Sequence, residues 1–150
     1  MSISRAEFES ILADTTKRVE GRIEWSDDED HSPAKEFTVP LVSEPGYPIK
    51  VRGRWNPAAG KLTYVLIHAT AGRIYGLDLG TDHHNPSCTY TGERHKHRWT
   101  PETRDKEAYV PSDIIADASD PETVWRQFCG EAKIRHDGPF QMPQVQQELL

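Results

Sequence analysis

The sequence predicts an α+β fold: a single domain in which an antiparallel β-meander of five to six strands packs with an N-terminal and a C-terminal helix. Hydrophobic and polar residues alternate in four segments, as they do in half-buried strands. Short turn sequences separate the strand-like segments, so strands that are neighbours in the chain should pair. A capped helix precedes them and another follows them. The 150 residues suffice for one core, and we assign residues 1–138 to the domain and 139–150 to a C-terminal tail.

A capping box predicts the first helix. Ser4 is the expected N-cap and Glu7 the expected third helical residue, because each side chain can bond the backbone N–H of the other. Apolar residues follow at helical spacing, at Phe8, Ile11 and Leu12. We expect this helix to extend to Lys17.

Five segments then predict strands: RVEGRIEW (18–25), EFTVPLV (36–42), IKVRGRW (49–55), KLTYVLIHA (61–69) and RIYGLDL (73–79). The fourth is the most apolar and is expected at the centre of the sheet. Pro40 predicts an edge or a bulge in the second, because proline cannot donate to the ladder. The acidic run SDDEDHSPA is expected to be a solvated hairpin loop. The third segment places Ile49, Val51 and Trp55 inward and Lys50, Arg52 and Arg54 outward.

The sequence SDPETVWRQFCGEA predicts the second helix, over residues 121–133. Asp120 is the expected N-cap, and Pro121 suits the first helical position because its missing N–H would have no partner there. The apolar stripe of this helix includes Trp125, Phe128 and Cys129, so we expect the cysteine to be a core residue.

Charge is distributed unevenly along a chain whose formal net charge is −6. Residues 45–106 carry 10 of the 18 Lys and Arg residues and only 5 of the 24 acidic ones. A basic centre in an acidic protein can attract an anion locally, because fields extend over about 8–10 Å at physiological salt. Cations that merely solvate an exposed sheet face explain the same pattern. Residues 45–77 contain Lys50, Arg52, Arg54, Lys61 and Arg73 and no acid.

The sequence predicts a cytoplasmic protein without a membrane segment. No apolar run approaches the roughly 18 residues of a transmembrane helix. The first ten residues, MSISRAEFES, lack the features of a signal peptide. The two cysteines, Cys88 and Cys129, are therefore expected to stay reduced.

Four of the seven histidines lie in one segment, HHNPSCTYTGERHKHRWT, residues 83–100. Read as a strand, ERHKHRW places His95 and His97 on one face and its cations on the other. Neither face is apolar, so such a strand lies at an edge of the sheet or lines a cleft. A charged edge strand, which protects a sheet from aggregation, is one interpretation.

The other two interpretations are chemical. A zinc site would use His84, Cys88, His95 and His97, which are ligand types that suit Zn²⁺. Metal-free cleavage of RNA would use two imidazoles as acid and base, because histidine titrates near neutral pH.

Charge favours the acid/base interpretation over zinc. Arg94, Lys96 and Arg98 flank the two histidines, and Glu93 is the only carboxylate within ten residues upstream of His95. The predicted catalytic residues are His95, His97 and His83, without a cofactor. The predicted phosphate-binding residues are Lys50, Arg52, Arg54, Arg73 and Arg98, and the residues predicted to stack on a base are Tyr75 and Trp99. His68, inside the central strand, is expected to be a core histidine with its hydrogen bonds satisfied.

Two resemblances bear on function. An N-terminal helix followed by a basic, histidine-bearing antiparallel meander resembles the small cytotoxic ribonucleases of the barnase, colicin and RelE-type toxin group. Separately, HHNP, HKHRW and AYVP are similar to a group of small uncharacterised bacterial proteins with a His-x-Asn-Pro turn and a His-x-His strand. The second resemblance covers about residues 77–130, implies no established activity, and identifies His83, Asn85, Pro86, His95 and His97.

Two classes of function stay open. The first is a small protein that acts on RNA or another nucleic acid, as a metal-independent endoribonuclease. The second is a binding or inhibitory module without chemistry, of mobile-element origin and with RNA, another polyanion or a protein as its partner. A zinc-binding domain is a variant of the second.

Overall fold

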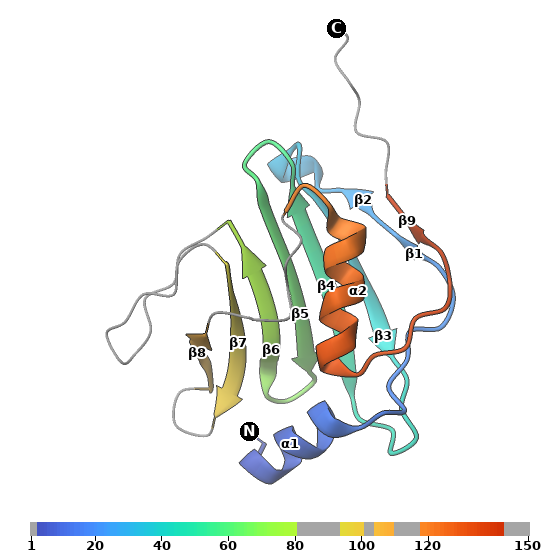
Figure 1. Cartoon of the computed structure of the whole chain (residues 1–150), viewed down its shortest axis with the longest axis vertical. Coiled ribbons are helices and arrows are strands. Elements are labelled where there is room, and N and C mark those ends of the chain that lie inside the picture. Colours follow the sequence, from blue (N-terminus) through green and yellow to red (C-terminus); the bar gives the residue numbers. More distant parts are fainter. Residues whose placement is uncertain (1–2, 81–93, 101–103, 110–117, 143–150) are drawn as a thin grey trace, which may run out of the picture.

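We describe a computed structural model of the chain, for residues 3–80, 94–100, 104–109 and 118–142, with residues 94–100 and 104–109 described by their backbone pairing. Seven strands form one antiparallel sheet in the order β2-β3-β4-β5-β6-β7-β8 (Figure 1). The strands are β2 (Ser26–Asp27), β3 (Lys35–Leu41), β4 (Ile49–Asn56), β5 (Lys61–His68), β6 (Gly72–Leu79), β7 (Arg94–Thr100) and β8 (Arg104–Tyr109). The predicted α+β fold with an antiparallel meander is therefore confirmed.

The first helix, α1 (Arg5–Ala13), begins with the predicted capping box but ends four residues earlier than predicted. Lys17 satisfies the carbonyl groups at this end. Its ammonium is fully buried and donates to the carbonyl oxygens of Ile11 (2.6 Å), Leu12 (3.0 Å) and Asp14 (2.6 Å). These carbonyls would otherwise lack partners at a helix C-terminus. Burial lowers the pKa of Lys17 to about 8.

The second helix, α2 (Pro121–Ala132), is confirmed, with the Asp120 side chain accepting from the Thr123 N–H at 3.2 Å. It lies across one face of the sheet, in front of β3, β4 and β5 (Figure 1). Phe8 of α1 and Trp125 of α2 belong to the same cluster of buried residues. We call the face that carries this core the covered face.

The covered face is built from aromatic rings that interlock with glycine. A Cβ on Gly53 of β4 would lie 2.1 Å from Cε2 of Phe37, so only glycine lets this ring cross the strand. The Phe37 ring then packs edge-on against Trp25 at 4.8 Å and Trp125 at 5.9 Å. Along β4 the burial alternates as predicted, with Ile49, Val51 and Trp55 buried and Lys50, Arg52 and Arg54 exposed or half-buried.

The segment 18–25 is not a strand of the large sheet, which corrects the prediction. Its alternation does bury Val19, Ile23 and Trp25. However, Arg18 makes only isolated bridges, and β1 (Ile23–Glu24) pairs in parallel with β9 (Phe140–Gln141). Alternation reveals which side chains are buried but not which strand is the partner. Here the partner comes from the part of the chain that we assigned to a tail.

The histidine strand β7 is not an edge strand, because β8 pairs with its outer side. The sequence RDKEAY of β8 has no apolar alternation, and so the sequence did not predict it. Pro40 does lie at an edge, since β2 pairs only with the first two residues of β3. In the part of the chain that the structure describes, no helix is long and apolar enough to cross a membrane.

Candidate functional site: the open face of the sheet

The face of the sheet opposite α2, which we call the open face, carries the predicted phosphate-binding cations of β4. A hollow of about 360 Å³ lies on this face. Val65 and Ile67 give it an apolar wall, and Val65 is buried there although it lies outside the hydrophobic core cluster. The remaining lining residues are polar or charged: Arg52, Arg54, Thr63, Arg73 and Asp78.

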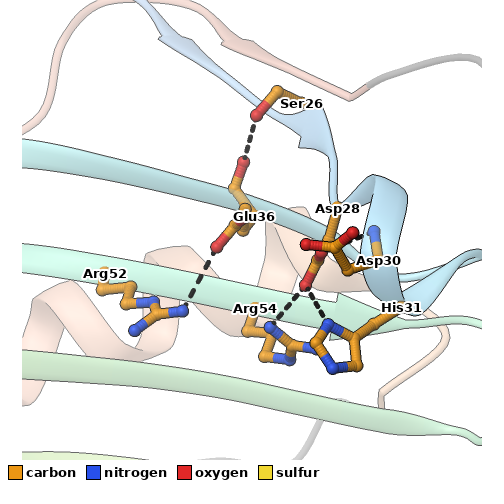
Figure 2. A network of polar contacts seen from close by, with 7 residues as sticks. All are labelled: Ser26, Asp28, Asp30, His31, Glu36, Arg52 and Arg54. Atoms are coloured by element: carbon orange, nitrogen blue, oxygen red, sulfur yellow. Dashed lines mark hydrogen bonds and ion pairs between the residues drawn. The ribbon is translucent and has the colours of Figure 1, made fainter.

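Both arginines of β4 form ion pairs with carboxylates from the acidic N-terminal part of the chain (Figure 2). An Arg52 nitrogen lies 3.2 Å from Glu36 on the neighbouring strand, and an Arg54 nitrogen lies 2.9 Å from Asp28. Each arginine uses one nitrogen in the pair, whereas a guanidinium carries five N–H donors. Either guanidinium can therefore contact a second anion while the carboxylate stays in place.

Asp28 is held in place from several sides. Its carboxylate accepts from the Asp30 N–H at 3.2 Å and contacts Nδ1 of His31 at 3.0 Å, as Figure 2 shows. Burial alone would raise the pKa of Asp28, but hydrogen bonds from Arg54 and His31 lower it below its ordinary value. Its side chain is only 12% exposed. The acidic run forms the loop of the β2–β3 hairpin, and residues 29–33 are exposed as predicted. Asp28 is the residue of this loop that folds against the sheet, at the start of a 3₁₀ turn, η1 (Glu29–His31).

Strand register brings the two histidines of β7 into line with these arginines. Across the sheet, Arg52 is followed by Val65, Gly76 and His97 in one row of paired positions. The neighbouring row runs from Arg54 through Thr63 and Asp78 to His95. Three strand spacings separate β4 from β7, or about 14 Å. Because paired positions share a face, His95 and His97 fall on the open face.

The cations that flank these histidines fall in the other set of rows. Arg94, Lys96 and Arg98 pair with Leu79, Leu77 and Tyr75, whose rows belong to the covered face. The alternation that the sequence predicted for this strand therefore agrees with its register. Arg98 is consequently not brought together with Arg52 and Arg54, with which it was grouped as a phosphate-binding residue.

Asp78 is the residue that sequence reasoning missed. It pairs with His95 across the β6–β7 ladder, and its Oδ1 accepts from the Thr63 hydroxyl at 2.8 Å. The sequence argument considered only carboxylates close to His95 in the chain, whereas Asp78 is 17 positions away. Alternation within RIYGLDL does place Asp78 on a polar face, but the pairing partner could not be predicted from it.

A family model described as a family of unknown function (DUF6978) matches residues 3–134. The chain belongs to this family. No curated protein and no solved structure matches it. The DUF6978 match confirms the coarser part of the resemblance, membership of an uncharacterised family, and extends it beyond residues 77–130. Bacterial origin and likeness to small ribonucleases stay predictions.

For this DUF6978 member, one predicted stacking residue is wrong. The Tyr75 side chain is fully buried, its ring lies 5.6 Å from that of Phe128, and its hydroxyl donates to Glu131 at 2.6 Å. A ring enclosed in the core has no face to offer a nucleobase. The predicted roles of the Trp99 side chain and of His83, His84, Asn85, Pro86 and Cys88 lie outside what the structure describes.

Two predicted structural residues are confirmed. His68 is buried, and its Nδ1 accepts from the backbone N–H groups of Thr70 (3.1 Å) and Ala71 (3.3 Å) in the β5–β6 turn. Cys129 is buried in the core, and burial raises its pKa to about 12. Among the side chains that the structure describes, no three histidine, cysteine or acidic residues gather in a metal-binding group.

Proposed function

We propose that this protein binds a phosphodiester polyanion, single-stranded RNA, on the open face of its sheet. The observation that carries the proposal is the hollow in which Arg52, Arg54 and Arg73 surround an apolar wall. Single-stranded nucleic acids are bound by surfaces that combine cations for the backbone with side chains, most often aromatic, that contact the faces of the bases. Half-buried Ile67 would supply that contact, in place of the buried Tyr75, and the buried Val65 lies beside it in the wall of the hollow.

The ion pairs of the arginines are compatible with this role. The side chains of Arg52 and Arg54 are 46% and 37% exposed. An exposed ion pair is worth only about 0–1 kcal/mol, and a phosphate offers arginine a bidentate partner. RNA can therefore compete for Arg52 or add to its pair with Glu36. Lys50, exposed two residues before Arg52 on the same strand, would extend the cationic track.

The test is binding of a fluorescein-labelled single-stranded oligoribonucleotide, measured by anisotropy in EDTA over a range of salt concentrations. The double variant Arg52→Gln/Arg54→Gln should bind more weakly, and its log–log salt slope should be smaller by about 1.4, since each phosphate contact on a single strand contributes about 0.7. The control is Arg18→Gln/Arg135→Gln. These arginines also form exposed ion pairs, with Glu20 and Asp137, but they do not line the hollow. An equal loss in both doubles, or no wild-type binding at low salt, would overturn the proposal.

Cleavage of the bound RNA stays a prediction. If His95 and His97 act as acid and base, products should form in EDTA with a bell-shaped pH profile, and His95→Ala or His97→Ala should abolish them. An oligonucleotide that is bound but unchanged would favour the binding or inhibitory module.

A further inference from the structure

We infer that Asp78, His95 and His97 form a binding site for one divalent transition metal ion of the zinc class on the open face. The observation is their placement by strand register. Asp78 and His95 are a directly paired couple of β6 and β7, and His97 follows two residues along the same strand. The three positions are thus neighbours on one face. This inference does not depend on RNA binding.

The set of residue types suits the ion. Two imidazoles and one carboxylate are a set of nitrogen and oxygen ligands that binds Zn²⁺ and its first-row neighbours. Paired residues of an antiparallel ladder have Cα atoms about 4.5–5.5 Å apart, and alternate residues of a strand are about 7 Å apart. Three ligands leave a fourth position for water, as in the open zinc sites that do chemistry.

The described neighbours of the site favour this use. The Thr63 hydroxyl bonds Oδ1 of Asp78 at 2.8 Å, and hydrogen bonds of this kind orient metal-binding carboxylates. Gly76 pairs with His97, so the position opposite this histidine carries no side chain. A Cβ on Gly76 would lie 2.9 Å from Val65 and 3.2 Å from the Tyr64 carbonyl oxygen. Val65 therefore fills the space over Gly76, and a side chain at this position would have no room.

Both sequence arguments against a metal lose their force in the folded chain. The flanking cations Arg94, Lys96 and Arg98 fall on the opposite face of the sheet from His95 and His97. A second carboxylate, besides Glu93 in the local sequence, comes from Asp78 on the neighbouring strand. The arginines of β4 are three strands, about 14 Å, from the two histidines and two strands, about 10 Å, from Asp78, with which they line the hollow together with Arg73.

The experiment uses the full-length protein, stripped with EDTA and dialysed against metal-free buffer. Zn²⁺ affinity is measured by competition with a chromophoric chelator, and Co²⁺ is used to report the ligands by its visible spectrum. We expect one ion per chain, with the affinity reduced at least tenfold in Asp78→Asn, His95→Ala and His97→Ala. Thr63→Val, which leaves all three ligands in place, should give a smaller loss.

Matched controls separate this site from general effects. Glu36→Gln removes a carboxylate from the same register row on β3 and should leave the affinity unchanged. Circular dichroism of each variant checks that the fold is kept. No stoichiometric binding by the wild type would overturn the inference. A thiolate-to-cobalt absorption band would also overturn the inference if binding were lost in Cys88→Ser and kept in Asp78→Asn. The ligands would then be His84, Cys88, His95 and His97.

Discussion

The two faces of the sheet are built from alternate residues of the same strands, yet they are organised in opposite ways. On the covered face, polar atoms of aromatic residues are buried, and those of Trp55 and Tyr64 donate to backbone carbonyls, whereas Nε1 of Trp25 has no partner among the described residues. Nε1 of Trp55 donates to the Ala118 carbonyl at 2.8 Å, and the Tyr64 hydroxyl donates to the Pro121 carbonyl at 2.7 Å. On the open face, charged groups such as Arg52 and Glu36 pair with one another in contact with solvent.

This difference separates stability from binding. Burial of apolar area stabilises the fold by roughly 25 cal/mol per Å², whereas exposed ion pairs contribute little. The covered face therefore holds the domain together. The open face contributes little to the free energy of unfolding, and its residues can be arranged to contact a ligand.

The largest expected effect tests this separation directly. Phe128→Ala removes a fully buried ring that packs against Tyr64 and Tyr75, and should lower the free energy of unfolding by about 3–5 kcal/mol. Arg52→Ala on the open face should change it by less than about 1 kcal/mol. Urea denaturation followed by circular dichroism measures both. Comparable losses would show that the open face is also structural.

Two glycines in the same sheet give a matched comparison. Gly53→Ala should destabilise the protein by about 1–3 kcal/mol, because its Cβ would meet the Phe37 ring at 2.1 Å inside an aromatic cluster. Gly76→Ala, whose Cβ would meet Val65 at 2.9 Å, should cost less, since Val65 borders the hollow and has room to move. The measurement is thermal unfolding. A larger loss of stability in Gly76→Ala than in Gly53→Ala would mean that the open face is packed more tightly than the covered face.

A third prediction concerns pH and the covered face. Nδ1 of His136 accepts from Nε1 of Trp125 at 3.1 Å, so Nε2 carries the proton and donates to the Gly21 carbonyl at 3.0 Å. Burial lowers the pKa of His136 below the ordinary 6.5, and the folded protein therefore keeps the ring neutral. The unfolded chain takes up the proton first. Stability should consequently fall as the pH drops below about 6.5, by at most about 1.4 kcal/mol per pH unit, until the folded-state pKa is reached.

The control for this pH effect is His136→Gln. Glutamine can accept from Trp125 but does not titrate, so the variant should be less stable at pH 7.5 and less sensitive to pH between 5 and 6.5. Denaturation curves at four pH values in this range measure the slope. If the free energy of unfolding changed equally with pH in the wild type and in His136→Gln, the pH dependence would come from groups other than His136.

The smallest expected effect is on the open face. Glu36→Gln removes the carboxylate that pairs with Arg52 and should raise the affinity for single-stranded RNA about two- to fivefold, with an unchanged free energy of unfolding. Anisotropy in EDTA at constant salt measures the affinity. A drop in RNA affinity would mean that Glu36 positions Arg52 for binding instead of competing with the phosphate.

The sequence by itself determined the features that depend on residues close together in the chain. The caps at Ser4 and Asp120 satisfy backbone groups within three residues, and both helices begin where predicted. Period-two alternation assigned the side chains of β4 to their faces, and it grouped His95 with His97 apart from the flanking cations.

Only the tertiary structure decided which segments meet. The carbonyls at the end of α1 bond to a lysine that folds back from outside the helix, and β1 depends on a partner more than a hundred residues away. The pairs Arg54–Asp28 and Asp78–His95 also join separate elements. Alternation reveals the face on which a residue lies, whereas its neighbours across the ladder depend on strand order and register. Those are set by the packing of the whole core, and for this reason the carboxylate opposite His95 could not be predicted from the sequence.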